Sequence, residues 1–393
     1  MTWTRRPGLL LGAAILLAGC DTPPRPSPSP TSPATLGAVA TRPSSTQQGV
    51  LPGPYAAVAT DLNTPGLTYQ VLLVTSNARI AARASAHVPT FDSFTIRRLH
   101  VPGASTSSSR AYFLDGDTDI RWLSPDGSTG LVKSIPAGST NDLAFAVSPD
   151  DRSIAVTVIS RDLDPAAVAA RTYVEDLSDG SGHRELSSTR GLQSMDWVVG
   201  WHGGSIVEAG GDLGCDASFG AQCVTSYRLV SAATGTTPAG LCAPASGLAG
   251  FTTPTGLPAA AGVAYADVLA ASNPSGPSVG TIFAVDWIGH HHVFAARDSS
   301  AANALNGCFL SPDGSRMACI SNDNQAIELL GPGGGITDLG FDYRILGWLD
   351  ATHLLVAVDV QTLGVVAVDR GSTRLLPFST DTIEFAGTLP NPL

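Results

Sequence analysis

Four short patterns in this chain contain residue types that can carry out chemistry, and the first is a serine between glycines. Residues 276–280, Gly-Pro-Ser-Val-Gly, match the Gly-x-Ser-x-Gly pattern of a nucleophile elbow. That elbow needs a strand before the serine and a helix after it, because only this sharp turn strains and exposes the side chain. Here a loop-like Asn-Pro pair precedes the pattern and a strand-like run, residues 281–285, follows it. We therefore interpret residues 276–280 as a loop between strands and assign no catalytic serine.

The second pattern is rich in carboxylates. Residues 115–119, Asp-Gly-Asp-Thr-Asp, place an oxygen ligand at every second position, as calcium-binding loops do. However, Ile120 stands where an EF-hand loop requires glycine, and the distal glutamate is missing. A hairpin turn at Gly116 and Asp117 explains the same residues. If metal bound there, the site would be weak and structural.

The third pattern is a run of three histidines, His290, His291 and His292, directly after Gly289. Side chains alternate in direction along a strand, so only His290 and His292 could share a face. Two ligands do not complete a zinc site. A solvated turn after Gly289 is the interpretation that we favour.

The fourth pattern consists of paired aspartates, Asp150 with Asp151 and Asp162 with Asp164. Such pairs resemble the two carboxylates of a glycosidase, but aspartate is also a common turn residue. The sequence contains no P-loop, dinucleotide fingerprint or HExxH pattern. We therefore predict no catalytic, cofactor-binding or metal-binding residue.

The composition indicates what kind of elements surround these patterns. The chain has 393 residues and a formal charge of -11, with only 14% of positions charged, which excludes a basic nucleic-acid-binding face. Lys133 is the single lysine, and there are five glutamates against 28 aspartates. Residues that favour helices are therefore scarce, while the turn former aspartate is abundant. We expect strands joined by tight turns, with one short helix candidate over residues 164–171.

Two short segments repeat along the chain. Residues 148–151 (Ser-Pro-Asp-Asp) and 311–314 (Ser-Pro-Asp-Gly) each lie between two apolar runs, which predicts a strand, a turn and a strand. Residues 198–207 and 345–356 share a Gly-Trp frame. The units start near residues 143, 196, 304 and 343, a spacing of about 40 to 55 residues or a multiple of it. That spacing suits one propeller blade of four strands with its loops.

The frame Phe-x-x-Ser-Pro-Asp-Gly-x-x-x-Ala resembles the TolB-type, WD40-like propeller repeats of bacterial envelope proteins. The likeness is good at residues 143–186 and 304–340, fair at 195–241 and 343–378, and loose at 251–297 and before residue 135. It implies an all-β fold, a β-propeller of four-stranded antiparallel blades over residues 55–393. We count seven blades, or six if the two earliest units merge. Further strands are expected over residues 69–86, 111–114, 119–123 and 129–135.

A propeller must close its ring to protect its edges, so one terminal strand is expected to complete the blade at the other end of the chain. Residues 383–385 and residues 71–74 are the two candidates for that strand.

Cysteine positions support the repeat register. Cys308 and Cys319 each lie five positions from the turn at residues 313–314, so they face one another across the expected hairpin. An exported protein can oxidise such a pair, and we predict a disulfide there, with two buried thiols as the alternative.

Three further cysteines leave the remaining connectivity open. Cys215 and Cys223 bracket a loop of small residues and would close it as a second disulfide. Cys242 could compete for either pair, because five cysteines remain if Cys20 is modified. The spacing matches no zinc site.

The N-terminus has the order of features of an export signal. Arg5 and Arg6 precede an apolar run, residues 9–17, that is too short to span a bilayer. Residues 17–20, Leu-Ala-Gly-Cys, resemble the bacterial lipobox. That resemblance implies that Cys20 receives a diacylglycerol group and becomes the mature N-terminus. An ordinary secretory signal is the alternative. Residues 1–19 are then a signal peptide, and residues 20–54 a lipidated, Pro/Ser/Thr-rich tether.

These features lead to one functional expectation and one rival. We expect a lipoprotein on the extracytoplasmic side of a bacterial membrane that presents the propeller as a non-enzymatic binding module. Its partners would be the membrane, through the N-terminal lipid, and an envelope protein or cell-wall component, with no nucleic acid and no cofactor. The rival is a secreted hydrolase or lyase that acts on glycans or peptides at the propeller funnel.

Overall fold

The computed structural model describes most of the chain after Leu51, and all described residues belong to one compact unit that extends from Ala34 to Leu393. The described ranges are 52–60, 67–89, 104–135, 141–160, 169–190, 194–212, 224–237, 239–241, 251–254, 258–268, 279–298, 305–321, 326–359, 361–379 and 383–390.

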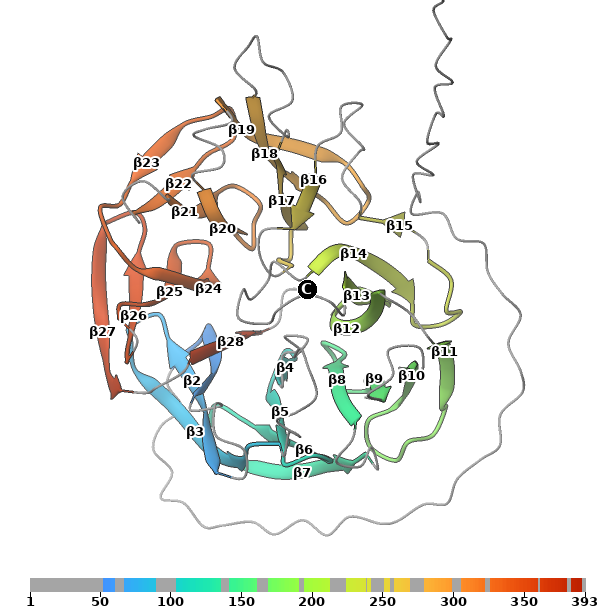
Figure 1. Ribbon diagram of the computed structural model, residues 1–393. Helices are drawn as coiled ribbons and strands as arrows, with labels where there is room; N and C mark the ends of the chain where they lie inside the picture. The colour runs from blue at the N-terminus through green and yellow to red at the C-terminus, as the bar shows by residue number, and fades with distance from the viewer. Residues whose placement is uncertain are drawn as a thin grey trace, which may run out of the picture. The chain divides into compact units, whose positions relative to one another are not determined.

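The described strands form seven four-stranded antiparallel sheets, the blades of a β-propeller (Figure 1). We number the blades along the chain and give each from its innermost to its outermost strand. Blade 1 contains β28 (Ile383–Leu389), β1 (Tyr55–Thr60), β2 (Thr68–Thr75) and β3 (Ile80–His87). Blade 2 contains β4 (Ala104–Thr106), β5 (Ala111–Asp115), β6 (Asp119–Leu123) and β7 (Thr129–Ser134). Blade 3 contains β8 (Asn141–Val147), β9 (Ser153–Ser160), β10 (Ala169–Asp176) and β11 (Arg184–Arg190).

The other four blades follow in chain order. Blade 4 contains β12 (Ser194–His202), β13 (Ser205–Asp212), β14 (Val224–Ser231) and β15 (Ala239–Gly240). Blade 5 contains β16 (Phe251–Pro254), β17 (Val263–Val268), β18 (Val279–Val285) and β19 (His291–Asp298). Blade 6 contains β20 (Leu305–Leu310), β21 (Met317–Ser321), β22 (Ile327–Leu330) and β23 (Ile336–Asp338). Blade 7 contains β24 (Arg344–Asp350), β25 (His353–Ala357), β26 (Thr362–Ala367) and β27 (Ser372–Ser379).

The predicted all-β propeller is therefore confirmed, with seven blades and not six. Of the two candidates for ring closure, residues 383–385 are correct, because β28 pairs with β1 as the innermost strand of blade 1. Residues 71–74 instead lie inside β2, the third strand of the same blade. The last strand of the chain thus protects the edge of the first blade.

The helix expected over residues 164–171 is wrong where the structure describes it. Ala169, Ala170 and Arg171 begin β10, which is hydrogen-bonded to β9 on one side and β11 on the other. Pairing on both sides outweighs the helical preference of alanine, because strand formation depends on neighbours more than on intrinsic propensity. The described residues contain no helix, and hence no helix long and apolar enough to cross a membrane.

The hydrophobic core lies between adjacent blades. One cluster joins Tyr112 and Ile120 of blade 2 to Phe145 and Val156 of blade 3, and other clusters link further neighbouring blades in the same way. Because each sheet is covered on both faces, its inner strands read as nearly continuous apolar runs. All six residues of β1 are buried.

The repeated Gly-Trp frame joins neighbouring blades. In β12 the ladder shifts register between Val198 and Gly200, and the indole of Trp201 then donates to the carbonyl of Ala146 in blade 3 at 2.9 Å. In β24 the register shifts between Ile345 and Gly347, and the indole of Trp348 donates to the carbonyl of Phe309 in blade 6 at 2.8 Å. A bulge bends the strand and re-aims the side chain that follows it, so each tryptophan reaches the preceding blade.

Candidate functional site

One end of the propeller carries the tight hairpin turns. Each blade runs antiparallel from its innermost strand outward, so the turns after its first and third strands lie at the same end. We call this end the hairpin face. Its turns include residues 107–110, 148–152, 203–204, 311–316 and 351–352 between first and second strands, and residues 124–128, 286–290 and 368–371 between third and fourth strands.

An open cavity lies among the innermost strands, with about 800 Å³ of space not occupied by protein atoms, including solvent outside its mouth. Its described lining comes from late positions in these strands and from the turns that follow them, so it belongs to the hairpin face. The lining consists of residues 104–106, 199–200, 258–260, 309–310, 312, 347–348 and 385–388.

Small residues at the bulges give the cavity its shape. Gly347 lies under the ring of Phe385, and a Cβ atom at this glycine would lie 2.5 Å from that ring. Such a contact is too close for any side chain, so glycine lets the strands of blades 7 and 1 approach each other. The Gly-Trp frame found in the sequence therefore marks both the blade contact and the cavity wall.

The described lining is apolar apart from a few hydroxyl groups. None of its residues is acidic, basic, a histidine or a cysteine. The hydroxyl of Ser105 accepts the backbone N–H of Val147 at 3.1 Å, and the indole of Trp348 is already bonded to blade 6. This lining can bury an apolar group, but it offers no general acid, general base or activated nucleophile.

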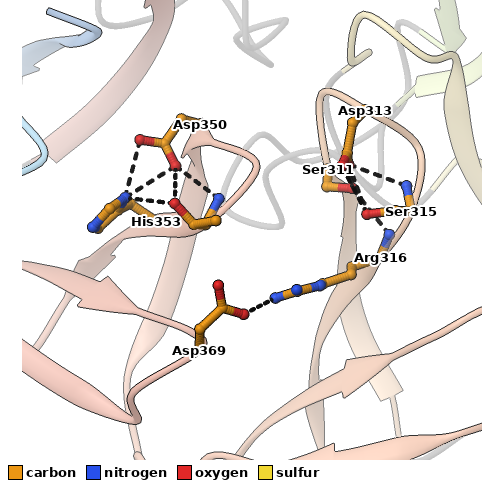
Figure 2. Close-up of polar contacts among 8 residues, drawn as sticks. Ser311, Asp313, Ser315, Arg316, Asp350, His353 and Asp369 are labelled. Atoms are coloured by element: carbon orange, nitrogen blue, oxygen red, sulfur yellow. Dashed lines mark hydrogen bonds and ion pairs between the residues drawn. The ribbon is translucent and has the colours of Figure 1, made fainter.

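The turns around the cavity are polar, and the Ser-Pro-Asp-Gly turn of blade 6 shows how they are built (Figure 2). The carboxylate of Asp313 accepts the hydroxyl of Ser311 at 2.7 Å, together with the amide and hydroxyl of Ser315. The hydroxyl of Ser311 in turn accepts the amide of Arg316 at 3.0 Å. The serine and aspartate thus satisfy the backbone groups that the turn leaves unpaired.

Neighbouring blade 7 adds two more polar pairs on the same face (Figure 2). The guanidinium of Arg316 bonds to Asp369, which links the turns of blades 6 and 7. The carboxylate of Asp350 accepts the Thr352 hydroxyl at 2.8 Å and faces His353 Nδ1 at 3.0 Å. The lining of the cavity does not include these side chains, which belong to the surrounding hairpin face.

Three carboxylates of the hairpin face are held in the charged form. Burial opposes the charge on Asp313, but hydrogen bonds from Ser311 and Ser315 outweigh it, and the pKa of Asp313 falls below its usual value. Burial likewise opposes the charge on Asp286, but the amides of His290 and Ile288 and the imidazoles of His292 and His290 outweigh it. The pKa of Asp286 is therefore lowered. Hydrogen bonds from Ser178 lower the pKa of Asp176. These groups stay ionised at any ordinary pH.

The turn of blade 3 departs from that of blade 6 at its fourth residue. Asp151 has a φ of 60°, in the left-handed region that a non-glycine residue rarely adopts. Its carboxylate accepts the hydroxyl of Tyr112 at 2.7 Å and that of Ser109 at 2.6 Å, both from blade 2. Asp150 stays within its own turn and accepts the hydroxyl of Ser148. Asp151 therefore joins two blades, and Asp150 stabilises its own turn. Asp162 and Asp164 lie outside the described residues.

The carboxylate-rich segment 115–119 forms the hairpin turn between β5 and β6, as predicted, with Asp115 opposite Asp119 and Gly116 at a φ of 67°. Asp115 accepts the amide and ring nitrogen of His87 and pairs with Arg121. Across the described residues, no three histidine, cysteine or carboxylate side chains converge as a metal site.

The solvated turn predicted after Gly289 is wrong in position: the turn covers residues 286–290, and His291 and His292 begin β19. His290 and His292 both point to Asp286, with nitrogen-to-oxygen distances of 3.4 and 3.5 Å, so they share a face. His291 lies on the other face and packs against the ring of Phe283. In the serine pattern, residues 276–278 are not described. The strand expected over residues 281–285 is confirmed, but it begins two residues earlier, because Val279 and Gly280, interpreted as loop, already belong to β18.

The disulfide between Cys308 and Cys319 is present, as predicted. Phe309 pairs with Ala318 and Leu310 with Met317, so the hairpin has the predicted register beside the bridge. The other cysteines singled out in the sequence lie outside the described residues: Cys20, Cys215, Cys223 and Cys242.

The structure also shows a turn that the sequence analysis missed. Residues 124–128 repeat Ser-Pro-Asp-Gly-Ser between β6 and β7, and the amide of Gly127 donates to the carbonyl of Ser124, as Gly314 does to Ser311. This copy lies between the third and fourth strands of its blade, and not between the first and second. A search for the tetrapeptide outside the expected blade frame would have found it.

One buried charge cluster lies apart from the cavity, within blade 4. Arg228 bonds to Glu208 at 2.7 Å and to Asp196 at 2.9 Å. Burial raises the pKa of Glu208 and of Asp196, and the positive charge of Arg228 opposes this rise in both. Because the guanidinium is shared by both carboxylates, we interpret this cluster as a structural tie between three strands.

Comparison with known proteins supports nothing beyond the fold. No protein-family model and no curated protein matches the sequence. Among solved structures, an oligogalacturonate lyase in complex with manganese is 11% identical, over 79% of this chain and 82% of that one, with a TM-score of 0.48. Oligogalacturonate lyase from Vibrio parahaemolyticus is 9% identical, over 83% and 91%, with a TM-score of 0.47. The periplasmic gluconolactonase of Pseudomonas aeruginosa is 13% identical, over 85% and 99%, with a TM-score of 0.42. Likeness at this level carries no inference about activity.

Proposed function

We propose that this chain is a lipid-anchored, extracytoplasmic binding protein whose propeller holds an envelope partner at the cavity of the hairpin face. The observation that carries this proposal is the described lining of the cavity, which is mostly apolar and contains no ionisable side chain. Concave, mostly apolar pockets are the usual places where proteins bury part of a ligand.

The alternative function, a hydrolase or lyase, needs a general acid or base within hydrogen-bond reach of the reacting bond. The described lining supplies none. Asp313 and Asp350 follow lining residues closely in the chain but are not part of the lining, and they accept hydrogen bonds within their own turns. The binding role is therefore the function that the cavity supports best.

Two features support the proposed location. The order of charge, apolar run, small residues and Cys20 in the sequence is that of a lipoprotein signal. The disulfide between Cys308 and Cys319 fits an oxidising compartment outside the cytoplasm. The Pro-rich segment before Pro54 would then act as a spacer between membrane and propeller.

The anchor is tested by fractionating cells that express the full-length chain or its Cys20→Ala variant after feeding a labelled fatty acid. We expect label and membrane retention in the wild type and in a Thr22→Ala control, and loss of both in Cys20→Ala. Unchanged membrane retention of Cys20→Ala without label would contradict the anchor.

Binding at the cavity is tested with the substitution Ala386→Arg, which places a charge among apolar residues of the lining. Leu131→Arg, on an exposed position of β7 away from the cavity, is the matched control. Quantitative crosslinking in native membranes should give a saturable adduct with the wild type and with Leu131→Arg, and a much weaker one with Ala386→Arg. Equal adducts from all three proteins would contradict binding at this cavity.

A further inference from the structure

The hairpin face carries an excess of negative charge around the cavity. Its described turns and the strand ends next to them contain nine aspartates and six arginines, and no lysine or glutamate. The aspartates are residues 126, 150, 151, 176, 179, 286, 313, 350 and 369, and the arginines are residues 79, 110, 152, 184, 316 and 370.

Two of these carboxylates lie next to the cavity wall along the chain. Asp313 directly follows Pro312, and Asp350 lies two positions after Trp348, both of which line the cavity. Hydrogen bonds from hydroxyl and amide groups fix the two carboxylates in place, at 2.7 Å from Ser311 to Asp313 and at 2.7 Å from the amide of Thr352 to Asp350. Ordered carboxylates at the mouth of an apolar cavity favour a cationic ligand over a neutral one.

The arginines of this face do not cancel that charge. Arg316 is paired with Asp369, Arg152 lies 3.7 Å from Asp150, and Arg110 stacks on the ring of Trp122 at 4.3 Å. Each of the two ion pairs uses one carboxylate, and Asp313 and Asp350 belong to neither. The face thus presents fixed negative charges around an apolar centre.

We propose that the partner held at this cavity is a basic segment of a protein, with an apolar side chain in the cavity and lysine or arginine residues beside Asp313 and Asp350. This inference rests on the proposed binding function and names the chemical class of its partner. An anionic lipid surface or an acidic glycan would meet like charge on this face, which disfavours both.

The proposal predicts a clear dependence on salt. Asp313 is exposed and Asp350 is partly exposed, so their attraction to a cationic segment falls as ionic strength rises, whereas burial of the apolar side chain does not. Affinity should therefore weaken several-fold between about 20 mM and about 500 mM salt, where the Debye length shortens from roughly 20 Å to roughly 4 Å.

The experiment uses the full-length protein in detergent and two labelled peptides, Lys-Lys-Leu-Phe-Lys-Lys and Glu-Glu-Leu-Phe-Glu-Glu, with fluorescence anisotropy as the readout. We expect saturable, salt-sensitive binding of the basic peptide and no saturable binding of the acidic one. The double variant Asp313→Asn/Asp350→Asn should lose about tenfold in affinity at low salt, since asparagine preserves the turn but not the charge. Asp117→Asn, in a turn at the opposite end of blade 2, is its matched control.

The cavity variant separates this inference from the proposed function. Ala386→Arg should abolish binding of the basic peptide, while Leu131→Arg should not, with circular dichroism confirming that both fold. The inference would be overturned if the Ala386→Arg variant still bound the basic peptide. It would also be overturned if the Asp313→Asn/Asp350→Asn variant bound that peptide as tightly as the wild type does. Saturable binding of the acidic peptide that Ala386→Arg abolishes would also overturn it, yet keep the binding cavity. Failure of the crosslinking test above would instead overturn the binding function itself.

Discussion

Blades 3 and 6 begin their inner hairpins with the same three turn residues, Ser-Pro-Asp, but the two hairpins are held in place differently. In blade 3 the fourth residue, Asp151, adopts a left-handed conformation and bonds to Tyr112 and Ser109 of the preceding blade. In blade 6 the fourth residue, Gly314, takes the same conformation and lies against Ala261 of the preceding blade, while a disulfide closes the hairpin.

The difference shows that one turn can join blades in two ways. Blade 3 uses hydrogen bonds, which need a side chain at the fourth position and tolerate its backbone strain. Blade 6 uses close packing, which needs the absence of a side chain, because a Cβ at Gly314 would lie 2.8 Å from that of Ala261. The same position in the repeat is therefore not interchangeable between the two blades.

The largest expected effect is loss of the disulfide in blade 6. The double variant Cys308→Ala/Cys319→Ala should lower the free energy of unfolding by about 3 kcal/mol, because the bridge closes a short loop and so restricts the unfolded chain. Urea unfolding of wild type and variant under oxidising conditions measures the difference. A loss below about 0.5 kcal/mol would mean that packing alone holds this hairpin.

The next effect comes from adding one methyl group to the turn of blade 6. Gly314→Ala should cost about 2 kcal/mol, since it adds backbone strain and overlap with Ala261. Gly127→Ala is the matched control: it lies in the same Ser-Pro-Asp-Gly sequence at a φ of 82°, with no neighbour near its added Cβ. The control should cost only about 1 kcal/mol for strain. Equal costs in urea unfolding would refute the role of the Ala261 contact.

Exchanging the fourth residue of blade 3 gives an effect of similar or smaller size. Asp151→Gly should destabilise by about 1 to 2 kcal/mol, because the hydroxyl of Tyr112 loses its partner while the backbone loses strain. In a Tyr112→Phe background that hydroxyl is absent, and the same change should be close to neutral. A double-mutant cycle by urea unfolding checks this coupling, and additive costs would argue against it.

The smallest effect is a dependence of stability on acid pH. The pKa of Asp313 is lowered in the folded protein, so the unfolded chain binds a proton more readily than the folded one. The stability that Asp313 contributes is therefore complete above about pH 4 and is lost as the pH falls through its folded pKa. The stability of Asp313→Asn, measured by thermal unfolding, should decline less steeply than that of the wild type between pH 5 and pH 2. Parallel curves would show that its hydrogen bonds do not favour the charged form.

The sequence alone predicted the repeat architecture because turn chemistry and strand composition are local. Cys308 and Cys319 gave the hairpin register of blade 6, and the run at residues 383–385 identified a closing strand among two candidates. The helix at residues 164–171 failed because pairing with β9 and β11 is not visible in local composition. The cavity was not predicted. Val199 and Trp348 belong to the repeated Gly-Trp frame, but the sequence does not show that these residues and Ala386, from three blades, line one space.

The role of Asp151 was hidden for a related reason. Its neighbours Ser109 and Tyr112 lie about forty residues earlier in the chain, so the sequence shows only a second turn aspartate. Asp151 differs because it stands, in place of glycine, at a position that needs a positive φ. Comparing the turns at residues 148–151 and 311–314 reveals this difference.

The most direct test of the binding function places a photo-crosslinking residue, p-benzoylphenylalanine, at Ala386 inside the cavity or at Leu131 on the outer strand β7. On irradiation of intact cells, we expect one discrete adduct from position 386, with the attached partner at its full mass, and no such adduct from position 131. Absence of an adduct from position 386, equal adducts from both positions, or a partner recovered as cleaved product would contradict a cavity that binds without catalysing a reaction.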